Sequence, residues 1–310
     1  MRPLIPPGTL TENPRRVLVT GASGLVGSAL VTELERCGWT VFRLVRHAPR
    51  MAREIQWCAG RARFPEGVSV DAVVHLAGEN LAAGRWTDAR KKAIRESRIT
   101  FTRALVIDLG QQTQPPRVWV NASAVGFYGD RGEEILDETS GGGAGFLAEV
   151  CAAWEKEARV AETWGARVVR LRTGMVLSAE GGALAKLRPV FRLGLGRRLG
   201  NGRQWMSWIA LSDLVGVVEL ALRDGRFAGP VNATAPEPVT NAVFTRALAR
   251  ALHRPAMLPV PSWVLNLVFG EMAEATLLAS TRAVPARLEA WNYPFRCRRI
   301  EDALREVTGV

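Results

Sequence analysis

The chain has 310 residues, of which 47% are apolar and 23% charged, and it carries 41 Lys and Arg against 30 Asp and Glu. This is an ordinary globular composition, sufficient for one large domain or two modest ones with their own cores. No stretch reaches the roughly 18 consecutive apolar residues that a membrane-spanning helix requires, so we expect no membrane partner.

The formal net charge of +11 raises nucleic-acid binding as a function. The basic residues are spread along the chain, however, and no nucleic-acid recognition motif accompanies them. An arginine-rich chain with a pocket for anionic phosphates would have the same excess of basic over acidic residues. We therefore expect no nucleic-acid partner.

The cysteines and histidines are too scattered to predict a metal site. They are Cys37, Cys58, Cys151 and Cys297, and His47, His75 and His253. The absence of paired spacing excludes the usual zinc patterns and favours reduced thiols in a cytoplasmic protein. The proline-containing residues 1–14 lack the apolar core of a secretion signal, and we expect them to form a flexible leader.

From residue 16 to residue 172, short β-rich runs alternate with longer helical patterns. We expect the following strands and helices: strands at 16–20, 40–45, 71–77, 117–122 and 167–172, and helices at 25–37, 88–109 and 147–164. This alternation predicts an α/β domain over residues 15–176, with a parallel sheet and crossover helices.

The pattern changes after Gly174, where glycine and proline become frequent. Short helices are expected at 213–222, 241–252, 262–278 and 300–307. Such a pattern does not continue a regular βαβ array. We expect residues 177–310 to form a smaller substrate-side lobe, with one or two strands returning to the sheet and a small helical domain over about 255–305.

A glycine-rich turn follows the first strand and opens the first helix. Its glycines are Gly21, Gly24 and Gly27, and the residues between them include Ser23, Leu25 and Val26. Glycines at these places permit a sharp turn, close approach of backbone to a pyrophosphate, and tight packing of helix on strand. The exposed amides of the helix start would bind the phosphates. The turn predicts a Rossmann-type, doubly wound fold that binds a dinucleotide.

The end of the second strand indicates which dinucleotide. An NAD site places an acidic residue about 20 residues after the glycines, where it binds the ribose hydroxyls. This chain has Val45 and Arg46 there, and no acid. A guanidinium suits the 2′-phosphate of NADP(H), so we expect NADP(H) as the cofactor.

Several stretches resemble one subgroup of the atypical extended short-chain dehydrogenase/reductases, known as epimerase family proteins or NAD-dependent epimerase/dehydratase-like proteins. The three-and-three glycine spacing is the first similarity. The others are His75-Leu76-Ala77-Gly78-Glu79-Asn80, Arg85-Trp86-Thr87, Ser97-Arg98, Ser123 to Gly129, Phe146 to Cys151 with Trp154-Glu155, Arg172 to Leu177, Trp205 to Ile209, and Leu258 to Met272. The last of these resembles a small C-terminal domain of unknown function.

The resemblance implies a set of cofactor contacts. Leu76, Ala77 and Gly78 would lie under the adenosine and ribose, and Arg98 would approach the dinucleotide from the following helix. The segment from Thr173 to Val176, which includes Met175, would contact the nicotinamide end. Small residues at the carboxyl end of a strand also leave room in the crevice where such sheets bind ligands.

Catalysis in the wider class uses a tyrosine and a lysine four residues later, assisted by a serine. The lysine lowers the pKa of the tyrosine so that its phenolate exchanges a proton with the substrate. The matching helix has Phe146 and Val150, neither of which transfers protons.

Replacements for this pair are few. Ser123 at a strand end either polarises a substrate carbonyl or satisfies backbone groups, and Tyr128 either faces the substrate or fills a gap. We take both as catalytic candidates. Glu149 and Glu155 are possible acids, although Glu155 reads mainly as helix-surface charge.

A third group of residues follows the basic loop at 194–202. Trp205, Trp208 and Arg203 either grip a flat or anionic substrate or pack the lobe interface. Related sequences are expected to have histidine where Ala210 stands, which removes any role of that histidine here.

Two functions follow from an intact cofactor site beside an altered proton-donor site. The first is an NADP(H)-dependent oxidoreductase or epimerase acting on an unknown small carbonyl or hydroxyl compound. The second is a catalytically silent NADP(H) sensor or scaffold. The sequence is compatible with a monomer or a homodimer.

Overall fold

A strand of buried β-branched residues begins the described part of the chain, which comprises residues 15–255 and 259–308 of a computed structural model. In β1 (Arg16–Thr20), Val17, Leu18 and Val19 are all fully buried. A strand covered on both faces is apolar at every position, as expected for a parallel sheet between two helical layers.

The central sheet has eight strands. Their order is β12-β8-β6-β5-β1-β2-β3-β4, with bounds Gly229–Ala233, Arg167–Thr173, Val118–Ala124, Ala72–His75, Arg16–Thr20, Thr40–Val45, Glu54–Cys58 and Arg61–Arg63. All neighbours are parallel except β3 and β4. Strand β1 pairs with β2 on one side and β5 on the other, so the chain reverses its direction of winding there. Open sheets of this kind bind ligands at such a switch point.

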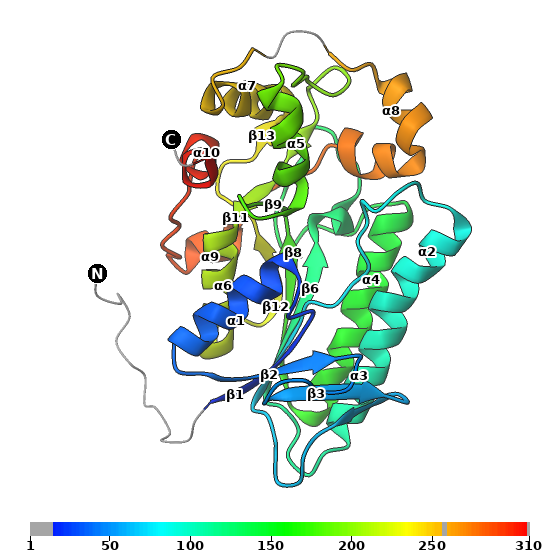
Figure 1. Ribbon diagram of the computed structural model, residues 1–310, viewed down its shortest axis with the longest axis vertical. Coiled ribbons are helices and arrows are strands. Elements are labelled where there is room, and N and C mark those ends of the chain that lie inside the picture. The colour runs from blue at the N-terminus through cyan, green and yellow to red at the C-terminus, as the bar shows by residue number, and fades with distance from the viewer. Residues whose placement is uncertain (1–14, 256–258, 309–310) are drawn as a thin grey trace.

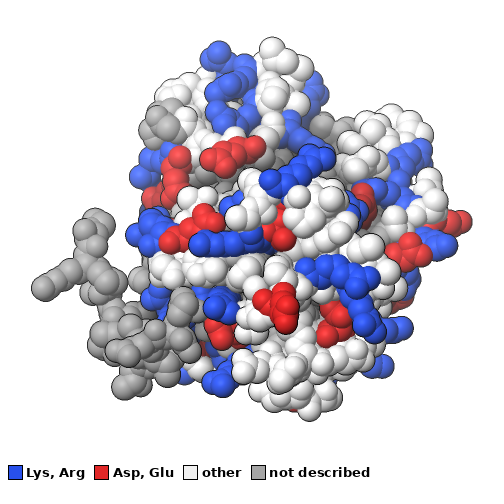
Figure 2. Space-filling view, turned by 60° about the horizontal axis from the view of Figure 1, so that its bottom comes forward, with Lys and Arg blue, Asp and Glu red and all other residues white. Residues whose placement is uncertain are grey.

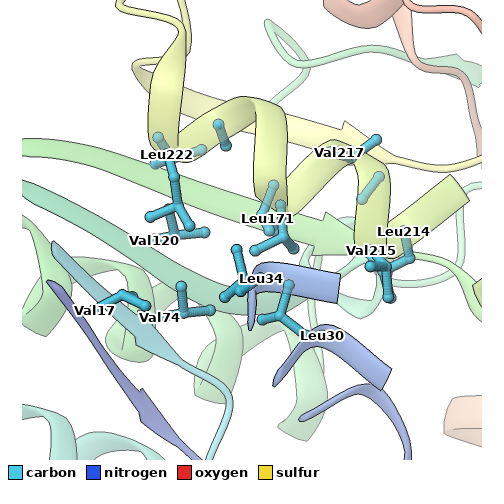
Figure 3. Packing of buried hydrophobic residues seen from close by; sticks show 14 of the residues in the cluster. Val17, Leu30, Leu34, Val74, Val120, Leu171, Leu214, Val215, Val217 and Leu222 are labelled. Atoms are coloured by element: carbon cyan, nitrogen blue, oxygen red, sulfur yellow. The ribbon is translucent and has the colours of Figure 1, made fainter. Parts of the chain in front are cut away.

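Helices cover both faces of the sheet (Figure 1). One face is covered by α1 (Leu25–Arg36) and α6 (Leu211–Arg223), and Figure 3 shows Leu30 and Leu34 of α1 meeting α6 and the strands. The other face is covered by α3 (Phe101–Gly110) and α4 (Phe146–Arg159). These helices pack on the strand side chains that point away from α1 and α6.

The rest of the chain forms the second lobe and its connections. Its larger elements are β9 (Met175–Leu177), α5 (Gly182–Arg192), β10 (Trp205–Met206), β11 (Trp208–Ala210), β13 (Val239–Thr240), α7 (Asn241–Ala251), α8 (Ser262–Phe269), η4 (Ala273–Leu278) and α10 (Ile300–Thr308). The shorter ones are η2 (Val125–Tyr128), β7 (Ile135–Leu136), η3 (Val160–Trp164), β14 (Arg282–Ala283) and α9 (Ala286–Ala290). A separate apolar core under α5, α7 and α10 holds this lobe together.

The predicted α/β fold with a doubly wound parallel sheet is confirmed, with three differences in detail. The hairpin of β3 and β4 was not predicted. The predicted helix at 88–109 is α2 (Asp88–Arg95), a π-helical turn and α3. The predicted helix at 262–278 is interrupted at Gly270, whose φ of 60° is left-handed and ends α8.

Two elements beyond residue 176 belong to the central layers, since β12 pairs with β8 and α6 packs on α1. Strand return from the second half is therefore confirmed. The expected leader at 1–14 lies outside the described residues. Within the described part of the chain, no helix combines the length and apolar character needed to span a bilayer.

His75 is a fully buried polar side chain between the sheet and α3. The Thr20 hydroxyl accepts from the amides of Leu76 and Ala77, so its hydrogen is free to donate to Nδ1 of His75 at 2.6 Å. Thr102 donates to a helix carbonyl and therefore accepts from Nε2 at 2.8 Å. The ring is thus neutral, and burial lowers its pKa to about 3.

The low pKa of His75 predicts how the stability of the protein depends on pH. The unfolded chain protonates this ring below its ordinary pKa of 6.5, whereas the folded chain does so only near pH 3. The contribution of His75 to the free energy of unfolding is therefore complete above pH 6.5. As pH falls from 6.5 to about 3, this contribution decreases by about 1.4 kcal/mol per pH unit. Denaturant unfolding should show the wild-type advantage over His75→Gln shrinking through this window; a constant difference would contradict the assignment.

Candidate functional site

The glycine turn brings the start of α1 against the end of β1. Gly21 has a φ of 69°, and a methyl group on Gly27 would lie 2.2 Å from the Gly21 carbonyl oxygen. Gly24 is exposed and precedes the first helical residue, with no side-chain cap on the free amides. Ser23 is also exposed. The turn thus leaves unshielded amides at the positive end of a twelve-residue helix, where phosphate oxygens bind.

Two further segments lie against this turn. A methyl group on Gly21 would lie 3.0 Å from the amide nitrogen of Ala77, so the loop after β5 touches the turn. On the other side, the Leu25 side chain contacts Gly181 and Gly182 at the start of α5. The amide of Ala77 is held by the Thr20 hydroxyl at 3.1 Å. The glycine turn, the β5 loop and the second lobe therefore meet at one edge of the sheet.

Arg98 is a cation without an acidic partner at this edge. Its guanidinium lies over Gly78, where a methyl group would be 3.1 Å from Cζ, and 5.1 Å from the Trp154 ring centroid. It forms no ion pair within residues 15–255 and 259–308. Burial lowers its pKa, which shows that the charge is partly desolvated. A desolvated and uncompensated guanidinium favours an anionic ligand.

The end of β2 lies beside the glycine turn, because Thr20 pairs with Leu44. Val45 is half-buried, and Arg46 is exposed. The sheet therefore places Arg46 next to the phosphate-binding edge, without an acidic residue at the same strand end.

A buried ion pair supports the carboxyl ends of β6 and β8. Arg172 on β8 donates to Glu155 on α4 through Nε at 2.9 Å and Nη2 at 3.0 Å, and the two residues are only 4% and 3% exposed. Burial opposes the charge of Arg172, but hydrogen bonds and charge attraction to Glu155 and Tyr128 together outweigh this and raise the pKa of Arg172. The expectation that Glu155 is surface charge is wrong, because α4 turns this side chain toward the sheet.

Ser123 and Tyr128 attach to the two ends of this ion pair. The Ser123 hydroxyl is buried and donates to Oε1 of Glu155 at 2.8 Å, so its partner is a carboxylate and not a backbone group. Tyr128 is fully buried; its hydroxyl accepts from Arg172 at 3.0 Å and lies 2.7 Å from Oδ1 of Asn232. Burial raises the pKa of Tyr128. Of the two alternatives for Tyr128, the structure favours the filling of the interior.

The residues at the positions where the wider class has its tyrosine and lysine belong to an apolar cluster. Phe146 and Val150 are buried with Trp86 and Met272, which belong to the loop before α2 and to the C-terminal segment. The ring centroids of Phe146 and Trp86 are 5.2 Å apart. The C-terminal segment thus packs where the wider class has its proton-transfer pair, and neither of these two positions has a titratable side chain.

The segment after β8 joins the two lobes. Thr173 is half-buried and bonds back to the Leu171 carbonyl, whereas Met175 begins β9 and pairs with Trp208. Trp208 is fully buried in the second lobe. Trp205 is half-buried and donates to Glu133 at 2.7 Å. Trp208 therefore packs within the protein, the second of the two alternatives, whereas Trp205 is half-buried and Arg203 is exposed.

Sequence reasoning missed Glu155 and Arg172 as a pair. They lie on a helix and a strand, and neither is part of a recognisable local motif. The available signal was a charged residue in an otherwise apolar β-run, Val168-Val169-Arg170-Leu171-Arg172. A charge in a central strand requires a buried partner.

The disruption of this ion pair is predicted to destabilise the fold. Arg172→Met leaves buried Glu155 with only the longer contact to Arg170, at 3.4 Å, and should lower the free energy of unfolding by about 3 kcal/mol, the lower end of the range for a broken buried pair. The double variant Arg172→Met with Glu155→Gln removes both charges and should recover part of this loss. Chemical denaturation of the three proteins tests both statements; a loss below about 1 kcal/mol in the single variant would show that the pair is not a buried unit.

Comparison with known proteins gives matches over most of the chain. A model of the NAD-dependent epimerase/dehydratase family matches residues 17–233, and a model of a domain of unknown function (DUF1731) matches residues 260–307. An epimerase family protein of Mycobacterium bovis is 46% identical over 297 residues, which are 94% of this chain and 97% of that protein. The epimerase family protein SDR39U1 of Mus musculus is 37% identical over 95% of this chain and all of its own.

A solved structure shows the same fold. The crystal structure of human epimerase family protein SDR39U1 (isoform 2) with NADPH superimposes with a TM-score of 0.88 at 34% identity. The match covers 95% of this chain and 99% of the human one.

Proposed function

The chain belongs to the NAD-dependent epimerase/dehydratase family, and on that basis we propose that it binds NADP(H) and acts as an oxidoreductase or epimerase on a small carbonyl or hydroxyl compound. The observation that carries this proposal is the desolvated, unpaired Arg98 beside a turn whose glycines leave helix amides open. Both features favour the binding of a diphosphate, and neither stabilises the protein without a ligand.

The described residues fit this cofactor. A side chain on Gly27 would clash with the turn, and one on Gly78 would displace the Arg98 guanidinium, so both positions are kept clear. Amides of Gly24, Leu25 and Val26 would hold the pyrophosphate together with Arg98. When bound, the nicotinamide supplies or accepts hydride.

We propose the remaining cofactor contacts from the positions of the residues in the fold. Ser23 and Arg46 would bind the phosphate-bearing ribose, with Val45 beneath it. Leu76 and Ala77 would line the adenosine side, and Thr173 and Met175 would face the nicotinamide end, where the two lobes join. The NADPH named for the human relative supports NADP(H) over NAD(H).

We propose Ser123 as the polar group nearest the reacting carbon. It stands at the carboxyl end of a central strand, where ligands of this fold bind. Since its hydrogen donates to Glu155, its lone pairs are free to accept a hydrogen bond from a substrate hydroxyl. Tyr128 would act through Arg172, by holding the other side of the guanidinium. A cytoplasmic location and the absence of a nucleic-acid partner remain predictions.

A second function is favoured by one specific observation. The apolar cluster of Phe146, Val150, Trp86 and Met272 occupies the place of the proton-transfer pair. A cofactor site that persists without this pair suits a protein that senses the NADP(H) pool or serves as a scaffold.

Cofactor selection gives the first test. Isothermal calorimetry should show wild-type protein binding NADPH at least about tenfold more tightly than NADH, a difference of about 1.4 kcal/mol. Arg46→Asp should remove this preference, because a carboxylate repels the 2′-phosphate and binds the ribose hydroxyls. Arg61→Asp on exposed β4 is the matched control and should change nothing. Failure of the wild type to bind either nucleotide would overturn the proposal.

Turnover gives the second test and separates the two functions. We expect the wild type to oxidise NADPH with at least one member of a panel of aldehydes and ketones. Ser123→Ala should then lower kcat/KM by about 10²-fold, by loss of a polar group at the reacting centre, without a change in NADPH affinity. Ser262→Ala, at an exposed helix start, is the control. A wild type that binds NADPH but reduces no member of the panel would favour the sensor instead.

A further inference from the structure

Two stretches of the chain carry no acidic residue. Residues 181–212 contain six Lys and Arg, and residues 238–270 contain three, with no Asp or Glu in either. The nine cations are Lys186, Arg188, Arg192, Arg197, Arg198, Arg203, Arg246, Arg250 and Arg254. In a chain with 30 acidic residues, two such stretches concentrate positive charge at one place if they fold together.

The two stretches do fold together. Arg254, just after α7, donates through Nε to the Arg192 carbonyl at the end of α5, at 2.9 Å. The Gly200 amide donates to the Val260 carbonyl at 2.8 Å, and the Ala242 amide to the Gly202 carbonyl at 2.9 Å. They form the end of the second lobe that is uppermost in Figure 1. Figure 2 shows Lys and Arg side chains at its upper end, and others over the rest of the face in view.

The nine cations are left without counter-charges. None forms an ion pair with any residue of the described chain, and eight of them are exposed, Arg188 being half-buried. Arg246 and Arg250 stand one turn apart on the same side of α7, an arrangement of like charges that weakens an isolated helix. Such a face is electrostatically suited to an anionic partner.

The same two stretches carry exposed apolar side chains. Of the ten large hydrophobic residues that are exposed in the described chain, six lie in these two stretches: Val190, Leu193, Leu195, Trp263, Leu267 and Val268. Leu193 is 75% exposed, and Trp263 and Leu267 are each 67% exposed. Apolar side chains that gather on one exposed face indicate a contact surface.

We propose that this end of the second lobe, formed by residues 181–203 and 242–270 without 256–258, docks on the surface of an anionic lipid bilayer. Aliphatic and tryptophan side chains enter the headgroup region, and the surrounding arginines bind lipid phosphates. The proposal departs from the expectation of no membrane partner, which rested on the lack of a spanning segment. Surface attachment needs no spanning helix, so the absence of such a helix among the described residues has no bearing on it.

Other occupants fit this face less well. A second copy of the chain related by a two-fold axis would bring nine uncompensated cations against nine others. Nucleic acid would use the cations, but five of the six exposed apolar residues are aliphatic and offer no surface for base stacking. An anionic bilayer binds both the cations and the exposed apolar side chains.

The test is sedimentation of the full-length protein with vesicles of phosphatidylcholine, alone or mixed with phosphatidylglycerol. We expect binding to the mixed vesicles only, weakened by high salt because exposed charges are screened. Leu193→Ser with Leu195→Ser should weaken partitioning by roughly tenfold, through the loss of two apolar side chains. Arg246→Glu with Arg250→Glu should weaken it by a similar factor.

Matched controls come from the opposite part of the molecule. Ile107→Ser on α3 removes an apolar side chain that is 50% exposed, and Arg61→Glu with Arg63→Glu reverses two exposed cations on β4. Neither should alter vesicle binding, and melting curves show whether each variant is folded. Wild-type protein that stays in solution with mixed vesicles would overturn the proposal, as would equal losses in the controls. A change of oligomeric state in the Leu193 and Leu195 variant, without vesicle binding, would assign the face to a second copy instead.

Discussion

The close approach of α1 to β1 is the constraint on which the rest of the site depends. The carbonyl oxygen of Gly21 occupies the space that a side chain on Gly27 would need, so helix and strand ends share one small volume. This contact directs the helix amides outward and sets the place of the β5 loop, because Ala77 touches Gly21. A larger residue at either glycine would separate helix from strand and remove the phosphate site together with the local packing.

A second constraint lies deeper in the sheet, where charge replaces the apolar contacts found elsewhere. Glu155 and Arg172 join α4 to β8, Ser123 attaches β6 to the carboxylate, and Tyr128 extends the network toward Asn232 on β12. Burial makes Arg172 dependent on Glu155, since removal of the carboxylate leaves an uncompensated charge. Ser123 and Tyr128 are thus held by the interior of the sheet, whereas Phe146 and Val150 on α4 belong to an apolar cluster.

The two lobes differ in how their surfaces are used. Around the central sheet, several exposed arginines pair with glutamates, as Arg36 does with Glu33 and Arg103 with Glu157, whereas others, such as Arg61, form no ion pair within the described residues. The far end of the second lobe has exposed cations without ion pairs together with exposed apolar side chains. We propose that one chain combines a crevice for a phosphate-rich cofactor with a separate basic and apolar face.

The sequence by itself determined the strand–turn–helix at the glycines, the alternation of strands and helices along much of the chain and the arginine at the end of β2, because periodicity and turn chemistry are read from neighbouring residues. The tertiary structure alone decided that Glu155 faces inward, that Tyr128 is enclosed, and that Trp86 and Met272 cover Phe146. These contacts join segments far apart in the chain, and a helical glutamate carries no local mark of the strand it will meet. Burial and pairing depend on the packing of whole elements, which no short pattern encodes.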